Sequence, residues 1–276
     1  MFFAAKPIIT LTTDFGLGDP YVGVMKGVIL SIAPDAAIVD ITHLIQSHDI
    51  VEAALVLRSS YSFFPAGTIH VVVVDPGVGS CRRPILLTTE KYFFVAPDNG
   101  VLSPVHKLAH HPEVFHLTAT EYFLKPVSNT FHGRDIFSPV AAWLSKGIDP
   151  MQLGKRISDL QELKIRLVRK IDENRMIGTV LRTDKFGNLI TNVSKQELSL
   201  PGKDRVPFVV RIADKTITQL RSSYAEAAPG ELFAVWGSSG LLEISVNQAS
   251  AAEILQASKD QEFVVELRQE LESANT

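Results

Sequence analysis

The first 150 positions of the chain alternate between continuous apolar segments and segments with helical spacing. Runs rich in β-branched residues predict strands buried on both faces, at residues 7–13, 36–42 and 68–74. Apolar residues recur at helical spacing between these runs, and Asp49 with Glu52 predicts a capping box at the start of the second helix. Such alternation of strands and helices is typical of a mainly parallel sheet covered by helices on both sides, a Rossmann-like three-layer α/β domain.

Further elements are expected to complete this first domain. The pattern predicts strands at residues 85–89, 92–96 and 114–118 and a final helix at residues 134–147. We therefore place the N-terminal α/β domain at residues 1–165, and we interpret the charged segment 155–175 as the bridge that leads out of it.

The pattern changes in the second part of the chain, from about residue 166 to residue 276. Short β-rich pieces are separated there by Gly, Asn, Ser and Pro, with one short helix around Ala251 to Ala257. These pieces predict a second, mainly antiparallel β-barrel-like domain.

Composition narrows the class of function. The formal charge is −3, the pI is near 6.2, and the Lys and Arg residues are scattered, so we do not expect nucleic-acid binding. No apolar run approaches the roughly 20 residues needed to cross a bilayer, so we expect no membrane insertion. A single cysteine, Cys81, and no basic region near the start of the sequence favour a cytoplasmic protein.

Acidic residues follow several of the predicted strands. Asp14, Asp75 and Asp98 each come at the end of such a strand, with a glycine nearby. In a parallel sheet the carboxyl ends of the strands meet at the edge where ligands bind, so we expect a site there. The loop before the last helix of the domain adds His132, Arg134 and Asp135 to the candidates. The alternative for each Asp–Gly pair is an ordinary turn, because both residues are common turn formers.

Three chemistries compete for this edge. The glycines of "DFGLGDPYVG" do not have the spacing of a dinucleotide fingerprint, which disfavours a nicotinamide cofactor. A metal site could recruit side chains from several loops, namely Asp14, Asp75, Asp98 and His132, but no two of them have the close spacing of a helical metal motif. The third possibility is a displacement without metal, in which an acid, an arginine and a histidine position and activate water.

Six segments together carry a resemblance to a known family. In chain order they are "TTDFG", "VVDPGVGSCRR", "APDNG", "TFHGRD", "DKFGNLITN" and "GSSGLLEISVN". This set strongly resembles the S-adenosylmethionine hydroxide adenosyltransferase family, which is related to the fluorinase and the chlorinase, and the resemblance runs from residue 7 to about 267. It implies an N-terminal α/β domain, a C-terminal β-barrel, and a homotrimer with sites between subunits.

The resemblance also implies a reaction and the residues that carry it out. Hydrolytic members of the family split S-adenosyl-L-methionine into adenosine and methionine, with an acid, an arginine and a histidine that fall here on Asp75, Arg82 and His132. A sulfonium leaves readily as a neutral sulfide, so the protein is expected to help mainly by holding and deprotonating water. Either His132 or Asp75 could accept the proton. An arginine beside Asp75 would suit this carboxylate to orient the water as an anion, and His132, whose ordinary pKa is nearest neutrality, is expected to be the better acceptor. Arg83 is expected to face solvent, because neighbours on an extended segment point in opposite directions.

Substrate contacts follow from the same resemblance, which implies neither a cofactor nor a metal. Asp14 matches the acid that binds the ribose hydroxyls, and Phe131 would lie beside the ribose or the adenine. The remaining contacts fall in the second domain: Asp184, Phe186 and Asn188 for the methionine ammonium and the adenine, Tyr224 for stacking, and Ser238 for the methionine carboxylate. The alternatives are that the aromatic residues are core residues and that Ser238 belongs to a simple turn.

One position favours hydrolysis over halogenation within the family. The halogenases carry Tyr where this chain has Asp75, and the fluorinase has an inserted loop soon afterwards that this chain lacks. An anion beside the nucleophile would repel halide and suit water. Two alternatives stay open: a halide-using, chlorinase-like transferase, and a non-catalytic sensor that binds S-adenosylmethionine or adenosine in the same pocket.

Overall fold

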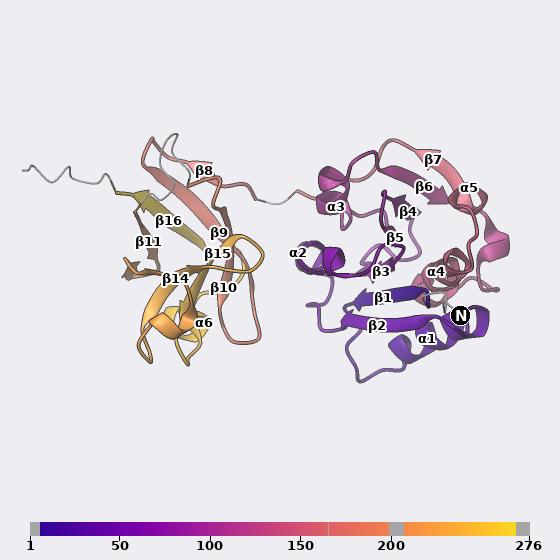
Figure 1. Cartoon of the computed structure of the whole chain (residues 1–276), viewed down its shortest axis with the longest axis horizontal. Helices are drawn as coiled ribbons and strands as arrows, with labels where there is room; N and C mark the ends of the chain where they lie inside the picture. Colours follow the sequence, from indigo (N-terminus) through magenta and orange to yellow (C-terminus); the bar gives the residue numbers. More distant parts are fainter. Residues whose placement is uncertain (1–5, 165, 199–206, 269–276) are drawn as a thin grey trace, which may run out of the picture. The chain divides into compact units, whose positions relative to one another are not determined.

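The computed structural model describes residues 6–164, 166–198 and 207–268 (Figure 1). The chain divides into two compact units between residues 164 and 165. The first is called unit 1 and the second unit 2, and each has its own hydrophobic core.

Unit 1 is built on a seven-stranded sheet in the order β2-β1-β3-β5-β4-β6-β7. Its strands are β1 (Ile8–Thr13), β2 (Ala37–Thr42), β3 (Ile69–Val73), β4 (Pro84–Thr88), β5 (Phe93–Pro97), β6 (Glu113–Leu117) and β7 (Gly154–Ile157). The pairs joining β2, β1, β3 and β5 are parallel, and the pairs that add β4, β6 and β7 are antiparallel. A tight turn closed by a hydrogen bond from Tyr92 N to Thr89 Oγ1 (3.0 Å) joins β4 to β5, and so short a connection permits only antiparallel pairing.

Helices cover both faces of this sheet, which confirms the predicted α/β class. The helices α1 (Tyr21–Ile32) and α4 (Ser138–Ser145) share one core cluster, and α2 (Ile50–Ser60) and α3 (Ser103–Leu108) share the other. Successive residues of β3 enter opposite clusters, as the pleat of a doubly covered strand requires. The shorter elements are α5 (Pro150–Leu153), η1 (Tyr61–Phe63), η2 (Thr120–Tyr122) and η3 (Gly133–Phe137).

The structure differs in detail from three local predictions for unit 1. Asp49 caps α2 by accepting a hydrogen bond from Glu52 N (3.0 Å), whereas the Glu52 carboxylate accepts from Gln46 N (2.9 Å), so only half of the capping box forms. The helix predicted at 134–147 begins as the π-helix η3 before it continues as α4. Placing all of 155–175 in a bridge was wrong, because β7 pairs with β6; its charged residues suit an edge strand.

Unit 2 is a mainly antiparallel sheet of nine strands within its described residues, curved into a half-barrel around its main core. Its strands are β8 (Arg169–Lys170), β9 (Arg175–Thr183), β10 (Leu189–Ser194), β11 (Phe208–Ile212), β12 (Lys215–Ile217), β13 (Leu220–Arg221), β14 (Leu232–Trp236), β15 (Leu241–Val246) and β16 (Glu262–Leu267). The predicted short helix is α6 (Ala251–Leu255), which packs into the core, and η4 (Tyr224–Glu226) lies between β13 and β14. The antiparallel β class of this half is therefore confirmed.

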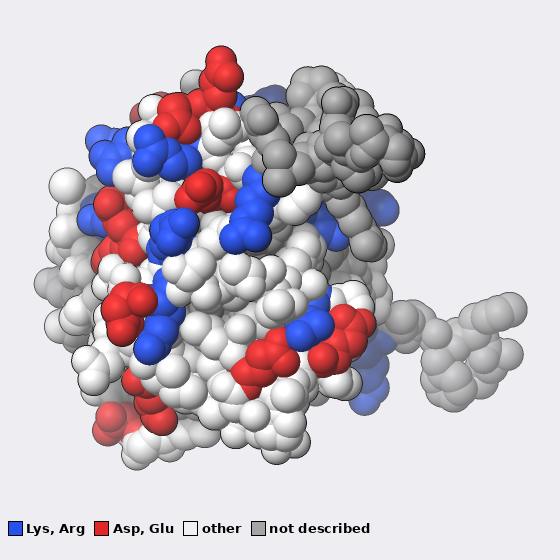
Figure 2. All heavy atoms as spheres, turned by 90° about the vertical axis from the view of Figure 1, so that its left-hand side faces the viewer, with Lys and Arg blue, Asp and Glu red and all other residues white. Residues whose placement is uncertain are grey.

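Charged side chains lie in small groups on the face of the molecule that Figure 2 shows. On the face shown in Figure 2, Lys and Arg side chains lie among Asp and Glu side chains, with uncharged areas between them. Within the described residues, no helix has both the length and the apolar character that crossing a membrane requires.

Candidate active site

The loop that follows β3 folds back on itself through consecutive turns. Val78 N donates to Asp75 O (3.2 Å), Ser80 N donates to Gly77 O (3.1 Å), and Arg82 N donates to Ser80 Oγ (3.2 Å). Gly79 has a φ of 76°, and a Cβ there would lie 2.3 Å from the backbone oxygen of Asn129, so only glycine fits. These turns bring the end of the loop back to the residue that begins it.

Arg82 links the other two side chains that the family resemblance assigned to catalysis, Asp75 and His132. Its Nε donates to Asp75 Oδ1 (2.9 Å), and its Nη2 donates both to Asp75 Oδ2 and to His132 Nδ1 (2.5 Å for the latter). The side chains of Arg82 and Asp75 are only 9% and 5% exposed, and the guanidinium lies over the Phe137 ring. Asp75, Arg82 and His132 are therefore in direct contact, with the arginine in the middle.

This contact determines the protonation of His132. A guanidinium can only donate hydrogen bonds, so Nδ1 acts as an acceptor and the neutral ring carries its proton on Nε2. Burial and the positive charge of Arg82 both lower the pKa of His132, against smaller opposing effects of Asp75 and Asp135. The imidazole is therefore neutral near pH 7, with a donor at Nε2.

The segment 128–135 holds His132 in place. Asp135 is fully buried, and its carboxylate accepts hydrogen bonds from Ser128 N (2.7 Å) and Arg134 Nε (2.6 Å). The carbonyl of Phe131 accepts from the backbone N–H groups of Arg134 and Asp135 as the π-helix begins. Arg134 and Asp135, two of the sequence candidates, thus support the loop that presents His132.

Asp14, Asp75, Phe131 and His132 line one cavity of about 300 Å³ at the carboxyl ends of β1 and β3. Asp14 Oδ2 accepts a hydrogen bond from His48 N (2.8 Å). Several residues that the sequence did not single out also line this cavity, among them Phe15, Tyr21, Ser47, His48 and Thr130. Phe15 and Tyr21 could have been suspected from their position after β1, but His48 reaches the site only through the path of the β2–α2 loop.

Asp98 does not join this cavity. Its carboxylate accepts hydrogen bonds from Arg83 Nε (2.9 Å) and Gln161 N (2.8 Å). The expectation that Arg83 faces solvent was therefore wrong. In the parts of the chain that the structure describes, no three His, Cys, Asp or Glu side chains gather as a metal site would require, so the metal set considered above is not assembled.

The substrate contacts expected in unit 2 all line a second cavity, of about 900 Å³: Asp184, Phe186, Asn188, Tyr224 and Ser238. The Asp184 carboxylate accepts hydrogen bonds from Asn188 N (2.9 Å) and Asn188 Nδ2 (2.9 Å), which closes the turn between β9 and β10. The same carboxylate also accepts from Phe186 N (2.8 Å). Asp184 thus shapes the wall of the cavity as well as contributing charge to it.

The two aromatic residues that were predicted for this cavity, Phe186 and Tyr224, are not core residues. Phe186 is 69% exposed and Tyr224 is 45% exposed, so both rings have faces available to a ligand. The Tyr224 hydroxyl donates to Glu243 Oε2 (2.7 Å); burial and the neighbouring carboxylate raise the pKa of Tyr224, and burial raises that of Glu243. Glu243 was not among the residues predicted from the sequence, although a lone charge within the apolar strand "LLEISV" was a usable signal.

Comparisons with known proteins cover both units. The N-terminal and C-terminal domains of the SAM hydroxide adenosyltransferase family match residues 9–154 and 178–264. An (R)-S-adenosyl-L-methionine hydrolase of Thermus thermophilus is 36% identical, covering 91% of this chain and 95% of its own length. A fluorinase of Nocardia brasiliensis is 27% identical, covering 90% of this chain and 92% of its own.

A solved structure of a conserved protein from Thermotoga maritima shares the fold. It superposes with a TM-score of 0.85 at 38% sequence identity, covering 93% of this chain and 99% of that one.

Proposed function

The chain belongs to the SAM hydroxide adenosyltransferase family, and we propose that it is an S-adenosyl-L-methionine hydrolase that forms adenosine and L-methionine. The observation that carries this proposal is the joint placement of Asp14, Asp75 and His132 in one cavity, in a chain similar over most of its length to a hydrolase. The oxygen of water bonds to the ribose 5′ carbon, the bond from that carbon to sulfur breaks with its electrons going to sulfur, and one proton is released.

The geometry supports separate parts for the three catalytic side chains. His132 Nε2–H would donate to the attacking water and orient it, since Nδ1 is engaged by Arg82. Asp75 would accept the proton, and Arg82 would hold both partners in place. The leaving group is already cationic, so attack can run ahead of proton loss, and a weak base held in position is sufficient.

The two cavities supply complementary contacts for the substrate. In unit 1, the Asp14 carboxylate accepts one hydrogen bond from His48 N and would use its remaining lone pairs to bind the ribose hydroxyls. Phe131 would pack beside the nucleoside. In unit 2, Asp184 would attract the methionine ammonium, Asn188 and Phe186 would bind the adenine, Tyr224 would stack, and Ser238 would hold the methionine carboxylate.

The relatives' names guide the choice of substrate and nucleophile. The Thermus protein is named for the R form of S-adenosyl-L-methionine, and we propose the same preference for this chain. The Asp75 carboxylate in the unit 1 cavity disfavours halide. Incubation of purified protein with the separated R and S epimers, with and without chloride, tests both points. Adenosine from the R epimer is expected; chlorinated nucleoside would contradict hydrolysis, and binding without turnover would indicate a sensor.

We further propose a homotrimer in which unit 1 of one copy and unit 2 of another complete each site. The unit 1 cavity, about 300 Å³, is at the lower end of the range for small-molecule pockets, which supports a need for further contacts. A heterologous interface repeated around a ring closes without exposed ends. Mixing Asp75→Asn protein with Asn188→Ala protein after dissociation, with the assay at a substrate concentration well below the raised KM, is expected to give more activity than the two variants show separately. No recovery in well-mixed oligomers would show that each site lies within one chain.

A further inference from the structure

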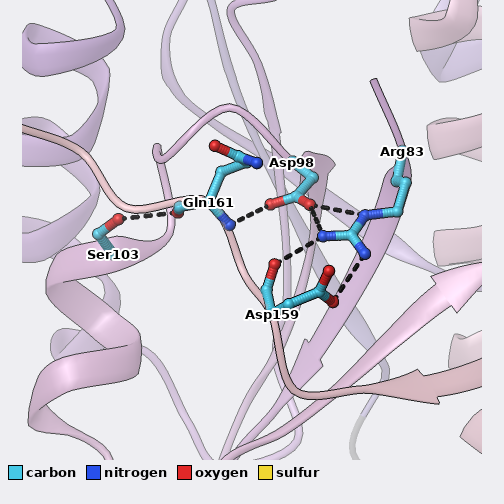
Figure 3. A network of polar contacts seen from close by, with 5 residues as sticks. All are labelled: Arg83, Asp98, Ser103, Asp159 and Gln161. Atoms are coloured by element: carbon cyan, nitrogen blue, oxygen red, sulfur yellow. Dashed lines mark hydrogen bonds and ion pairs between the residues drawn. The ribbon is translucent and has the colours of Figure 1, made fainter. Parts of the chain in front are cut away.

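Arg83 follows Arg82 directly and binds a different set of partners. Its guanidinium donates to Asp98 Oδ2 through Nε (2.9 Å) and Nη2 (2.5 Å). It also donates to Asp159, through Nη1 to Oδ1 (2.8 Å) and through Nη2 to the backbone oxygen (2.7 Å). Figure 3 shows this guanidinium between Asp98 and Asp159, two aspartates that come from segments far apart in the sequence.

Asp98 connects this arrangement to the chain at several points. Its side chain is only 1% exposed. Its Oδ1 accepts from Gln161 N (2.8 Å), and its own backbone N–H donates to the carbonyl of Arg83 (2.8 Å). The backbone and the side chain of Arg83 are therefore both held by the same residue.

The segment 159–163 is fastened to the same place. Leu163 N donates to Ser103 Oγ (2.8 Å). Ser103 Oγ in turn donates to the carbonyl of Gln161 (3.3 Å), which is the bond drawn on the left side of Figure 3. At Gly100, which has a φ of 95°, a Cβ would lie 2.8 Å from Leu163 N. The end of unit 1 thus lies tightly against the loop after β5.

We propose that Arg83 is a positioning residue, which through Asp98 and Asp159 fixes the backbone from which Arg82 reaches Asp75 and His132. The inference rests on the proposed function. Arg82 reaches both Asp75 and His132 with one rigid guanidinium, so its Cα must be placed accurately. On one side the backbone N–H of Arg82 is bound by Ser80, and on the other side follows Arg83, which is held by its own partners. Misplacement of a catalytic group by about 1 Å can cost about 10²-fold in rate.

Substitution of Arg83 tests the proposal in the full-length protein. Arg83→Met is expected to lower kcat by about 10-fold to 10²-fold, with the KM for S-adenosyl-L-methionine changed less than about 3-fold, because substrate contacts remain. Arg83→Lys keeps the positive charge without the planar guanidinium, so we expect its kcat to lie between those of Arg83→Met and the wild type. Asp159→Asn removes one exposed contact and is expected to lower kcat about 3-fold.

Two matched controls separate positioning from general loss of ion pairs. Arg156→Met removes an exposed pair with Glu113 (2.9 Å), and Lys107→Met removes an exposed pair with Glu162 (3.1 Å) that also ties down the segment before residue 164. Both are expected to keep wild-type kcat. Equal losses in Lys107→Met and Arg83→Met would overturn the proposal, because they would place the effect in the segment rather than in Arg82.

NMR titration of His132 gives a readout that needs no activity. The charged groups that act on the pKa of this imidazole are Arg82, which lowers it, and Asp75 and Asp135, which raise it. In Arg83→Met the pKa of His132 is expected to rise towards its ordinary value as Arg82 withdraws, whereas Arg156→Met leaves it unchanged.

The outcomes distinguish the proposal from the function on which it rests. Wild-type protein that releases no adenosine would contradict the function, while the titration would still decide the role of Arg83. Wild-type kcat and an unmoved His132 titration in folded Arg83→Met would overturn the positioning role. If Arg83→Met does not fold, Arg83→Lys and Asp159→Asn decide the matter: wild-type kcat in both would overturn the proposal.

Discussion

Replacing Arg82 with lysine tests the centre of the catalytic group. The guanidinium donates three hydrogen bonds, two to Asp75 and one to His132, and a single ammonium cannot reproduce this planar arrangement. Hydrogen bonds to charged groups contribute about 1.5–3 kcal/mol each, so the loss of two removes about 3 kcal/mol or more of the interactions that orient the site. Fully expressed in the transition state, about 3 kcal/mol corresponds to a loss of about 10²-fold in kcat.

The assay is the initial rate of adenosine release at saturating S-adenosyl-L-methionine, followed by chromatography. Adenosine affinity, measured by titration calorimetry, is expected to stay within about 3-fold of wild type, because the nucleoside contacts proposed for Asp14 and Asn188 are unchanged. Arg156→Lys serves as the control, since the ion pair of this arginine with Glu113 is exposed. A kcat for Arg82→Lys within about 3-fold of wild type would refute the view that the arginine fork organises the site.

Two other predictions concern pH and binding. Burial and Arg82 lower the pKa of His132, so the ring is neutral at any pH above its ordinary pKa of 6.5. We therefore expect kcat to fall only at lower pH, where protonation of Nδ1 breaks its bond with Arg82. A pH–rate profile whose acid limb lies at or above pH 6.5 would contradict this. Asp14→Ala and Asn188→Ala are expected to raise KM about 10-fold or more with a smaller effect on kcat, because they contact nonreacting parts of the substrate; an unchanged KM in both variants would remove them from the site.

The strand ends of unit 1 could be predicted because parallel strands bring their carboxyl ends to one edge. Asp14 and Asp75 do line one cavity there. Asp98 follows the same rule but turns to Arg83 instead. The expectation that Arg82 and Arg83 point in opposite directions agrees with their separate partners; what the local pattern could not show is that Asp159, 76 positions away, would receive the second arginine.

Other features escaped the sequence for different physical reasons. The edge strand β7 looks like a charged linker because its exposed positions are polar, and only its pairing with β6 shows that it belongs to the sheet. The contact between Asp14 and His48 joins a side chain to a backbone N–H, which any residue other than proline could supply. Glu243 shows the opposite case, because a charge within an apolar strand is visible in the sequence and deserved a functional reading.

The most direct test of hydrolysis at the 5′ carbon is the reaction of purified protein with S-adenosyl-L-methionine in oxygen-18 water, followed by mass spectrometry of both products. The proposed site delivers water to the ribose carbon, so adenosine is expected to carry one oxygen-18 atom at its 5′ hydroxyl, with methionine unlabelled. Unlabelled adenosine, or the formation of methylthioadenosine or S-adenosylhomocysteine in its place, would contradict the reaction assigned to Asp75, Arg82 and His132.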